Sequence, residues 1–181
     1  MNYEANYTTA LTYMRAGLSD RALESLHKAI EAIPKGDKVK ENVVYFRILT
    51  ILTQIYLQNG SRADALKYIE EGLNIKDDHS DLMFLKSLCL WDEKQYDEML
   101  ELLVKYIVSF MSSETEKYEY DFTGEGALNE FYGNLLPIAC QNSNCYEQIL
   151  KIVEKLASKT NQEHIVHAYD VMLKTIDSKK C

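Results

Sequence analysis

The sequence predicts an all-α protein in which antiparallel helix pairs stack into a right-handed superhelix of about nine helices. Three observations predict this fold. The 181 residues include only seven glycines and two prolines, so few residues interrupt helices. Apolar residues recur at spacings of three and four, as on one face of an α-helix. A pattern of small and apolar residues also repeats at intervals near 34 residues.

Four stretches share the repeated pattern, with the same offsets between its five positions. The four sets are Tyr13, Gly17, Ala22, Leu26 and Ala29; Tyr56, Gly60, Ala65, Ile69 and Gly72; Leu90, Lys94, Met99, Leu103 and Tyr106; and Cys140, Asn144, Ile149, Val153 and Leu156. About nine extra residues separate the first two sets, and about sixteen separate the last two. We expect the repeats at about 3–36, 46–79, 80–113 and 130–160, in one domain covering 1–181.

The pattern has a physical explanation. Small residues at its alanine and glycine positions allow the two helices of a pair to approach closely, and larger apolar residues fill the layer between pairs. Such a pair cannot bury both of its apolar faces alone, so several pairs must stack.

The helices are placed by this pattern and by local start and stop signals. Ser19, Ser61 and Asp97 are suitable caps or first-turn acids. Pro137 should kink its helix or shift its start. The expected helices cover residues 2–16, 19–33, 38–58, 61–75, 79–93, 95–112, 125–141, 145–159 and 161–178.

Two polar inserts and a terminal helix complete the organisation. The insert at 35–43 should lengthen a loop and the helix after it, and the Tyr- and Gly-bearing insert at 111–126 should form a long loop. The amphipathic segment 161–178 should close the stack with one polar face outward.

Composition limits the classes of partner. The formal net charge of −8 disfavours nucleic acid and anionic membranes, since both attract Lys and Arg. No window approaches 18 apolar residues, and the first twenty residues lack the pattern of a signal peptide. Cys89 and Cys140 lie in apolar helical stretches, and Cys140 and Cys145 are five apart, which fits no redox or zinc spacing. Cys181 is the last residue of the sequence. These cysteines favour a reducing, cytoplasmic compartment.

No catalytic, cofactor-binding or metal-binding motif is found, so an enzyme is not expected. Glu163 precedes both His164 and His167, and the histidines are three apart, unlike a zinc-protease helix. The acids of 77–81 lack the glycine and terminal glutamate of a calcium loop, and instead favour a helix start near His79. Gly124 and Gly126 lack the Lys-Ser/Thr ending of a phosphate loop.

The first helix of each pair should line a concave groove that binds a protein or peptide. Aromatic, amide and arginine side chains on those helices are typical of such recognition. The candidate residues are Tyr7, Leu11, Met14 and Arg15; Arg47, Thr50, Gln54 and Gln58; Phe84, Leu88, Trp91 and Asp92; and Phe131, Asn134, Ile138 and Gln141. Trp91, the single tryptophan, is the best anchor candidate, and completion of the core is the alternative role for Tyr7, Phe84, Leu88 and Phe131.

Over about residues 3–159 the repeats resemble the tetratricopeptide family. Residues 80–107, SDLMFLKSLCLWDEKQYDEMLELLVKYI, and 124–156, GEGALNEFYGNLLPIACQNSNCYEQILKIVEKL, are also similar to the repeat tail of bacterial family 2 glycosyltransferases. That resemblance implies a role beside a glycosyltransferase catalytic domain, which these residues do not include. The groove positions offer Arg15, Arg47 and Asn134 but not the complete Lys/Asn/Arg clamp of the chaperone-binding members.

The expected function is that of a non-catalytic scaffold module that binds a protein or peptide. Two alternatives stay open: a repeat tail or accessory subunit of a bacterial glycosyltransferase, and a regulator that senses a small peptide. An exposed edge of the stack would also allow self-association into a homo-oligomer.

Overall fold

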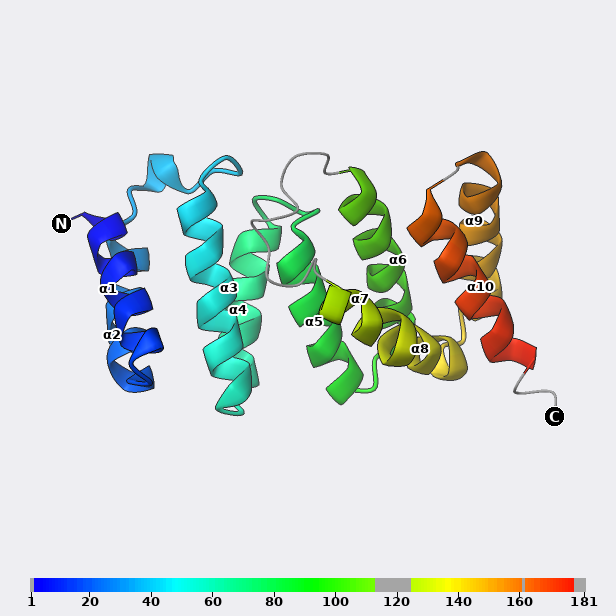
Figure 1. Ribbon diagram of the computed structural model, residues 1–181, viewed down its shortest axis with the longest axis horizontal. Coiled ribbons are helices and arrows are strands. Elements are labelled where there is room, and N and C mark those ends of the chain that lie inside the picture. Colours follow the sequence, from blue (N-terminus) through cyan, green and yellow to red (C-terminus); the bar gives the residue numbers. More distant parts are fainter. Residues whose placement is uncertain (1, 113–124, 161, 178–181) are drawn as a thin grey trace. The chain divides into compact units, whose positions relative to one another are not determined.

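The computed structural model describes residues 2–112, 125–160 and 162–177, and over these residues the chain is helical without strands (Figure 1). The all-α class is therefore confirmed, whereas the handedness of a superhelix stays a prediction. The chain divides into two compact units, Met1–Asp77 (unit 1) and Asp78–Cys181 (unit 2). The sequence predicts a single domain, and the division falls between its second and third repeats.

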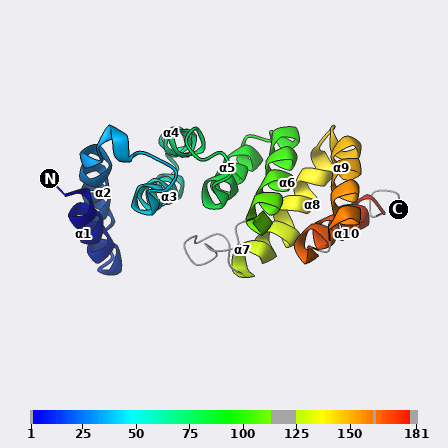
Figure 2. The same ribbon diagram turned by 90° about the horizontal axis from the view of Figure 1, so that it is seen from above.

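Unit 1 consists of two antiparallel helix pairs. The first is α1 (Tyr3–Arg15) with α2 (Ser19–Ala32), and the second is α3 (Val43–Gln58) with α4 (Arg62–Leu73). Besides the contacts within each pair, α2 packs against α3 (Figure 2). The two pairs therefore form one small stack.

Small side chains are fully buried within this stack. Ala22 and Ala29 on α2 and Ala65 on α4 are all 0% exposed, and Gly72 is buried as well. A methyl group or a single hydrogen at these positions lets neighbouring backbones approach, while larger buried residues such as Leu26 fill the space beside them. The predicted burial of the small positions is confirmed in unit 1, and the close approach of the helices there stays a prediction.

The turn inside each of the first three pairs contains one residue with a left-handed backbone. It is Gly17 (φ 71°) after α1, Gly60 (φ 73°) after α3, and Lys94 (φ 59°) in unit 2. These residues occupy the same position of the repeat. Glycine adopts this conformation without strain, whereas a lysine side chain crowds its own backbone there.

The first insert forms a short 3-10 helix, η1 (Lys35–Asp37), and an irregular segment. The helix after it begins at Val43, so the prediction that it starts at residue 38 is wrong. The reason is local, because the Asn42 side chain accepts a hydrogen bond from the Tyr45 backbone N–H (3.1 Å) and thereby caps α3.

A polar contact ties this insert to α4. The Lys38 ammonium lies 2.7 Å from Glu71 Oε1, and the buried Tyr45 hydroxyl donates to the same oxygen at 2.9 Å. Burial raises the pKa of Glu71, but the hydrogen bonds from Lys38 and Tyr45 outweigh it and lower the pKa overall. Glu71 is therefore held as a carboxylate between two donors.

A second polar cluster joins three helices of unit 1. Hydrogen bonds link His27 Nε2 to the Tyr56 hydroxyl (2.7 Å) and His27 Nδ1 to the Tyr68 hydroxyl (3.4 Å). The two tyrosine rings are stacked with centroids 5.8 Å apart. Burial, followed by the charge of Tyr56, raises the pKa of Tyr68 to about 12, so its hydroxyl stays protonated.

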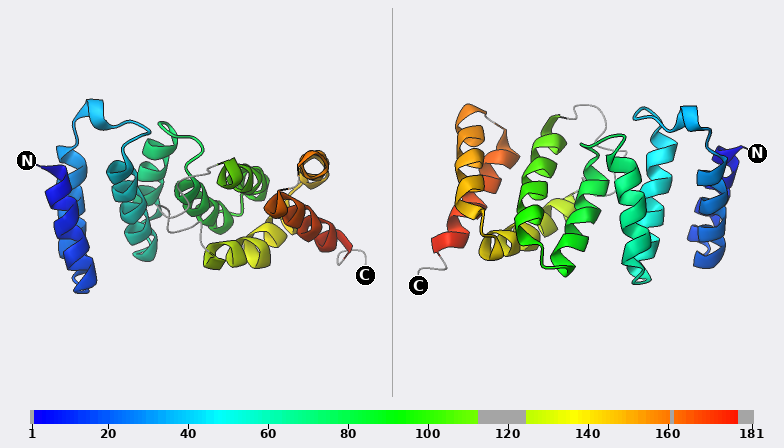
Figure 3. Two further views of the ribbon diagram at one scale, coloured as in Figure 1. Left: turned by 45° about the horizontal axis from the view of Figure 1, so that its top comes forward. Right: turned by 180° about the vertical axis from the view of Figure 1, so that it is seen from behind.

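Unit 2 continues the paired arrangement and ends in a three-helix group. α5 (Ser80–Asp92) pairs with α6 (Tyr96–Ser112), and α9 (Tyr146–Lys159) pairs with α10 (Glu163–Asp177). Figure 3 shows α9, in orange, next to α10, in red, and the two helices cross at an angle. The closing helix α10 also packs against α8 (Leu136–Asn142), which in turn packs against α6.

Pro137 lies directly after a π-helical turn. The helix expected at 125–141 consists of α7 (Glu125–Glu130), the π-helical η2 (Phe131–Leu135) and α8. The Leu136 N–H bonds to the Phe131 carbonyl, five residues back. This widened turn gives room to the proline ring, which would otherwise collide with the carbonyl four residues earlier. The predicted disturbance at Pro137 is confirmed.

A row of rings links the helices of unit 2. The Phe84 and Tyr106 centroids are 5.9 Å apart, and Tyr106 and Phe131 are 5.4 Å apart. Phe131 meets Tyr132 at 4.8 Å, and Tyr132 meets His167 on α10 at 4.4 Å. This aromatic row anchors η2 between α6 and α10. The insert before it falls mostly at 113–124, outside the described residues, as does Cys181.

Lys94→Gly should raise the free energy of unfolding by about 1 kcal/mol, because it removes the strain of a left-handed lysine. Glycine also gives the unfolded chain more conformational freedom, and this smaller effect opposes the gain. Urea denaturation followed by circular dichroism measures this. The reverse change, Gly60→Lys, should lower stability. A Cβ at position 60 would meet no other atom within 4 Å, so the strain of the left-handed backbone is the main effect of this substitution. A less stable Lys94→Gly variant would contradict the strain argument.

Glu71→Gln should lower the free energy of unfolding by about 1 kcal/mol, because a neutral amide pairs less well with Lys38. Thermal unfolding of the wild type and the variant tests this at neutral pH. The control is Glu24→Gln, which breaks the exposed Lys28–Glu24 pair on α2 and should leave the midpoint unchanged. Equal midpoints for wild type and Glu71→Gln would show that the insert is not held by this contact.

Candidate functional site

The groove residues predicted in unit 1 lie on α1 and α3, and their spacing of three and four places each set on one face of its own helix. These two helix faces are here called the α1/α3 face. Tyr7, Leu11 and Gln54 are half-buried, and Met14 is 39% exposed. Arg15, Arg47 and Gln58 are exposed. Thr50 is a correction, since it is only 3% exposed and belongs to the core.

The predicted residues of unit 2 are more deeply placed. Phe84 and Phe131 are 4% and 0% exposed, so of the two roles considered for them the structure shows completion of the core, and they are no longer groove candidates. Both rings pack against Tyr106, which explains their burial. Leu88 and Trp91 are half-buried, and Asn134 is exposed and donates to Glu130 Oε2 at 2.9 Å. The other positions are Asp92 and Gln141, exposed, and Ile138, half-buried.

Three groove candidates, Thr50, Phe84 and Phe131, are buried for a physical reason. A repeat position identifies the face of a helix, but its depth depends on which neighbour covers that face. At Phe131 the π-helical turn additionally rotates the face of the helix relative to its regular repeat position. Because the sixteen candidate residues belong to two separate units, a continuous groove stays a prediction.

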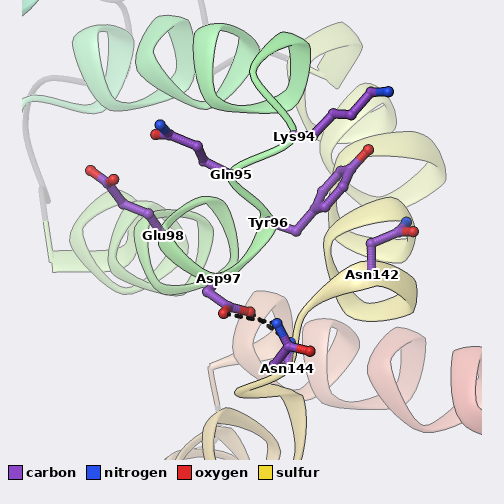
Figure 4. Close-up of a pocket in the computed structure, with 7 residues that line it drawn as sticks. All are labelled: Lys94, Gln95, Tyr96, Asp97, Glu98, Asn142 and Asn144. Atoms are coloured by element: carbon purple, nitrogen blue, oxygen red, sulfur yellow. Dashed lines mark hydrogen bonds between the residues drawn. The ribbon is translucent and has the colours of Figure 1, made fainter.

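A polar hollow in unit 2 was not predicted. It has a volume of about 310 Å³ and lies between the α5–α6 turn and the α8–α9 turn (Figure 4). Its lining residues are Lys94, Gln95, Tyr96, Asp97, Glu98, Asn142 and Asn144. The one sequence feature that could have indicated it is Lys94, at a repeat position where the first two copies have glycine.

Asp97 joins the two turns at the base of the hollow. Its Oδ1 accepts hydrogen bonds from Ser143 Oγ (2.8 Å) and the Asn144 backbone N–H (2.6 Å), and its Oδ2 accepts from Asn144 Nδ2 (3.3 Å). The Cys145 N–H, at the start of α9, also points to Oδ1 at 3.4 Å. The sequence predicts Asp97 as a cap or first-turn acid of its own helix, and it lies in the first turn of α6. Its carboxylate also accepts from backbone N–H groups directly before α9, up to 48 residues later.

These donors stabilise the ionised carboxylate. The hydrogen bond from Ser143, followed by those from Asn144, lowers the pKa of Asp97 below its ordinary value. The second carboxylate of the hollow, Glu98, lies 3.0 Å from the Lys86 ammonium. Both acids therefore have partners within unit 2.

A second hollow, of about 460 Å³, lies between the end of α9 and the start of α10. Its lining residues are Ala157, Thr160, Glu163, Val166, His167 and Asp170. The neighbouring His164 is engaged by Tyr132, whose hydroxyl lies 3.2 Å from His164 Nδ1 and donates to the His164 carbonyl at 3.0 Å. The histidine pair of α10 thus takes part in the packing of η2 against α10.

Two further findings concern metals and membranes. Within residues 2–112, 125–160 and 162–177, no group of three or more His, Cys, Asp or Glu side chains is placed to hold a metal ion. The helices of the same ranges include none whose length and apolar character suit a membrane crossing.

Comparison with known proteins adds no family assignment. No protein-family model matches the chain, and no curated protein shows significant sequence similarity to it. The likeness to tetratricopeptide repeats therefore rests on the repeated residues themselves, and the likeness to glycosyltransferase tails stays an expectation.

Asp97→Asn should weaken the pH dependence of stability. Because the folded pKa of Asp97 is lowered, its ionised form adds stability above about pH 4 that is lost as the pH falls through the folded pKa. Asparagine keeps the hydrogen-bond acceptor and removes the charge. Urea denaturation between about pH 3 and pH 7 should show the wild type and variant converging at low pH. A constant difference would mean that the charge contributes nothing.

Proposed function

We propose that the chain is a non-catalytic module that binds a protein or peptide segment on the α1/α3 face of unit 1. The observation that carries the proposal is that two exposed arginines on this face lack an acidic partner among the described residues. Within the described part of the chain neither Arg15 nor Arg47 forms an ion pair, although the protein has an excess of acidic residues. Both guanidinium groups are exposed and available to a partner.

The apolar neighbours support the same function. Tyr7 and Leu11 are only half-buried, and Met14 is among the exposed large apolar residues. Tyrosine, methionine and arginine are enriched in protein interfaces, and a flexible methionine adapts to the shape of a partner. The face combines apolar area for affinity with arginines that set orientation and charge preference.

A reducing, cytoplasmic compartment is part of the proposal. Cys89 and Cys140 are buried in helices, and Cys145 carries a half-buried thiol beside Ser143. Buried thiols of this kind act as small apolar groups and do not require an oxidising environment.

The test compares two double variants with equal changes of charge. Arg15→Glu/Arg47→Glu alters the α1/α3 face, and Lys35→Glu/Lys40→Glu alters the exposed insert of the same unit as a control. Each protein is immobilised, partners are captured from lysate of the cells that express it, and the purified partner is then titrated calorimetrically.

We expect the partner's affinity to fall by at least about tenfold in the arginine variant, because each lost arginine contact at an interface costs about 1 kcal/mol or more. The lysine variant should bind as the wild type does. Equal losses of affinity in both variants would show that the partner binds by non-specific charge attraction. Unchanged affinity in the arginine variant would refute binding on the α1/α3 face. Circular dichroism confirms that each variant is folded.

A further inference from the structure

Lys94 has a left-handed backbone conformation that is strained for a residue with a side chain. Its φ of 59° lies in the left-handed region, and the equivalent residues Gly17 and Gly60 have nearly the same backbone. A Cβ added at either glycine would meet nothing within 4 Å, so backbone conformation decides the preference for glycine there. Strained backbone conformations are concentrated at functional sites, so the Lys94 side chain beside this hollow is a candidate for binding.

The polar groups of the hollow fall into two sets. The carboxylates of Asp97 and Glu98 are engaged by the start of α9 and by Lys86. The Lys94 ammonium is exposed and takes part in no ion pair within the described ranges. The hollow thus retains one available cation while its two acids are already bound.

Amide oxygens and a ring accompany this cation. Asn142 uses its Nδ2 to donate to the Ile138 carbonyl at 2.8 Å, and Asn144 uses its Nδ2 toward Asp97. Each asparagine therefore keeps its Oδ1 as an acceptor. In Figure 4 the side chains of Lys94, Tyr96 and Asn142 lie on one side of the view, whereas Gln95 and Glu98 extend to the other.

We propose that this hollow is a binding site for a carboxylate group of a peptide. The Lys94 ammonium pairs with the carboxylate, the Oδ1 atoms of Asn142 and Asn144 accept peptide N–H groups, and the Tyr96 ring packs against the aliphatic part of the ligand. A phosphate dianion fits less well, because Asp97 and Glu98 line the same hollow and repel a second negative charge. The site lies in unit 2 and does not depend on the α1/α3 face.

The test uses four small probes and NMR. The probes are N-acetyl-Ala-Ala with a free carboxylate, the same dipeptide with a C-terminal amide, N-acetyl-Ala-Asp-amide, and inorganic phosphate. The shifts of the Asn142 and Asn144 side-chain amides are followed as each probe is added to the full chain. The variants are Lys94→Gly, which removes the ammonium and relieves the backbone, and Lys151→Met, which removes an exposed lysine of α9.

We expect saturable shifts with the free-carboxylate dipeptide, and an affinity at least about tenfold lower for Lys94→Gly, as for the loss of one charge-assisted hydrogen bond. Lys151→Met should bind as the wild type does. Binding of N-acetyl-Ala-Asp-amide would extend the site to acidic side chains, and its failure would restrict the site to chain ends; both support a carboxylate site.

Four outcomes would overturn the proposal. They are no saturable shift with either carboxylate probe, equal affinity for the amidated dipeptide, tighter binding of phosphate than of the carboxylates, and undiminished binding by Lys94→Gly. A thermal midpoint of Lys94→Gly at or above that of the wild type shows that lost binding is not lost folding. Loss of partner binding through Arg15 and Arg47 is measured separately, so the two proposals succeed or fail independently.

Discussion

The complete burial of small residues is the constraint on which the packing of unit 1 depends. Ala22, Ala29 and Ala65 have no exposed surface, so a larger side chain at any of them would have to displace the residues packed around it. In unit 2 the position of Ala22 and Ala65 is taken by Met99 and Ile149, and aromatic rings centred on Tyr106 fill the space between helices. One repeated pattern is thus satisfied by two kinds of packing.

Polar contacts fix the position of the segments that interrupt the repeat. The first insert is held through Glu71, which binds both Lys38 and Tyr45, and the start of α9 is held through Asp97. In each case a single carboxylate accepts from several donors that lie far away in the sequence. Such contacts satisfy groups that a loop or a helix end would otherwise leave to water, and so they fix the positions of segments that the apolar pattern does not determine.

The two candidate binding surfaces follow from charges that the fold leaves available. Arg15 and Arg47 are exposed on the α1/α3 face, and Lys94 lines one hollow with Tyr96, Asn142 and Asn144. In a protein of net charge −8, available cations on defined surfaces favour acidic ligands there. The surfaces belong to different units, so they can serve one extended partner or two separate ones.

By itself the sequence determined the all-α class, the order of the helices, their pairing in unit 1 and the disturbance at Pro137, because these depend on local periodicity, caps and breakers. Most helix ends were predicted to within two residues, and the start of α3 was not, since the Asn42 cap ends the insert. Only the tertiary structure decided between groove and core for Phe84 and Phe131, placed Thr50 in the core, and brought Asp97 to the backbone before α9. Depth below the surface and hydrogen bonds across some 48 residues depend on which segments meet in space, which a one-dimensional repeat does not contain.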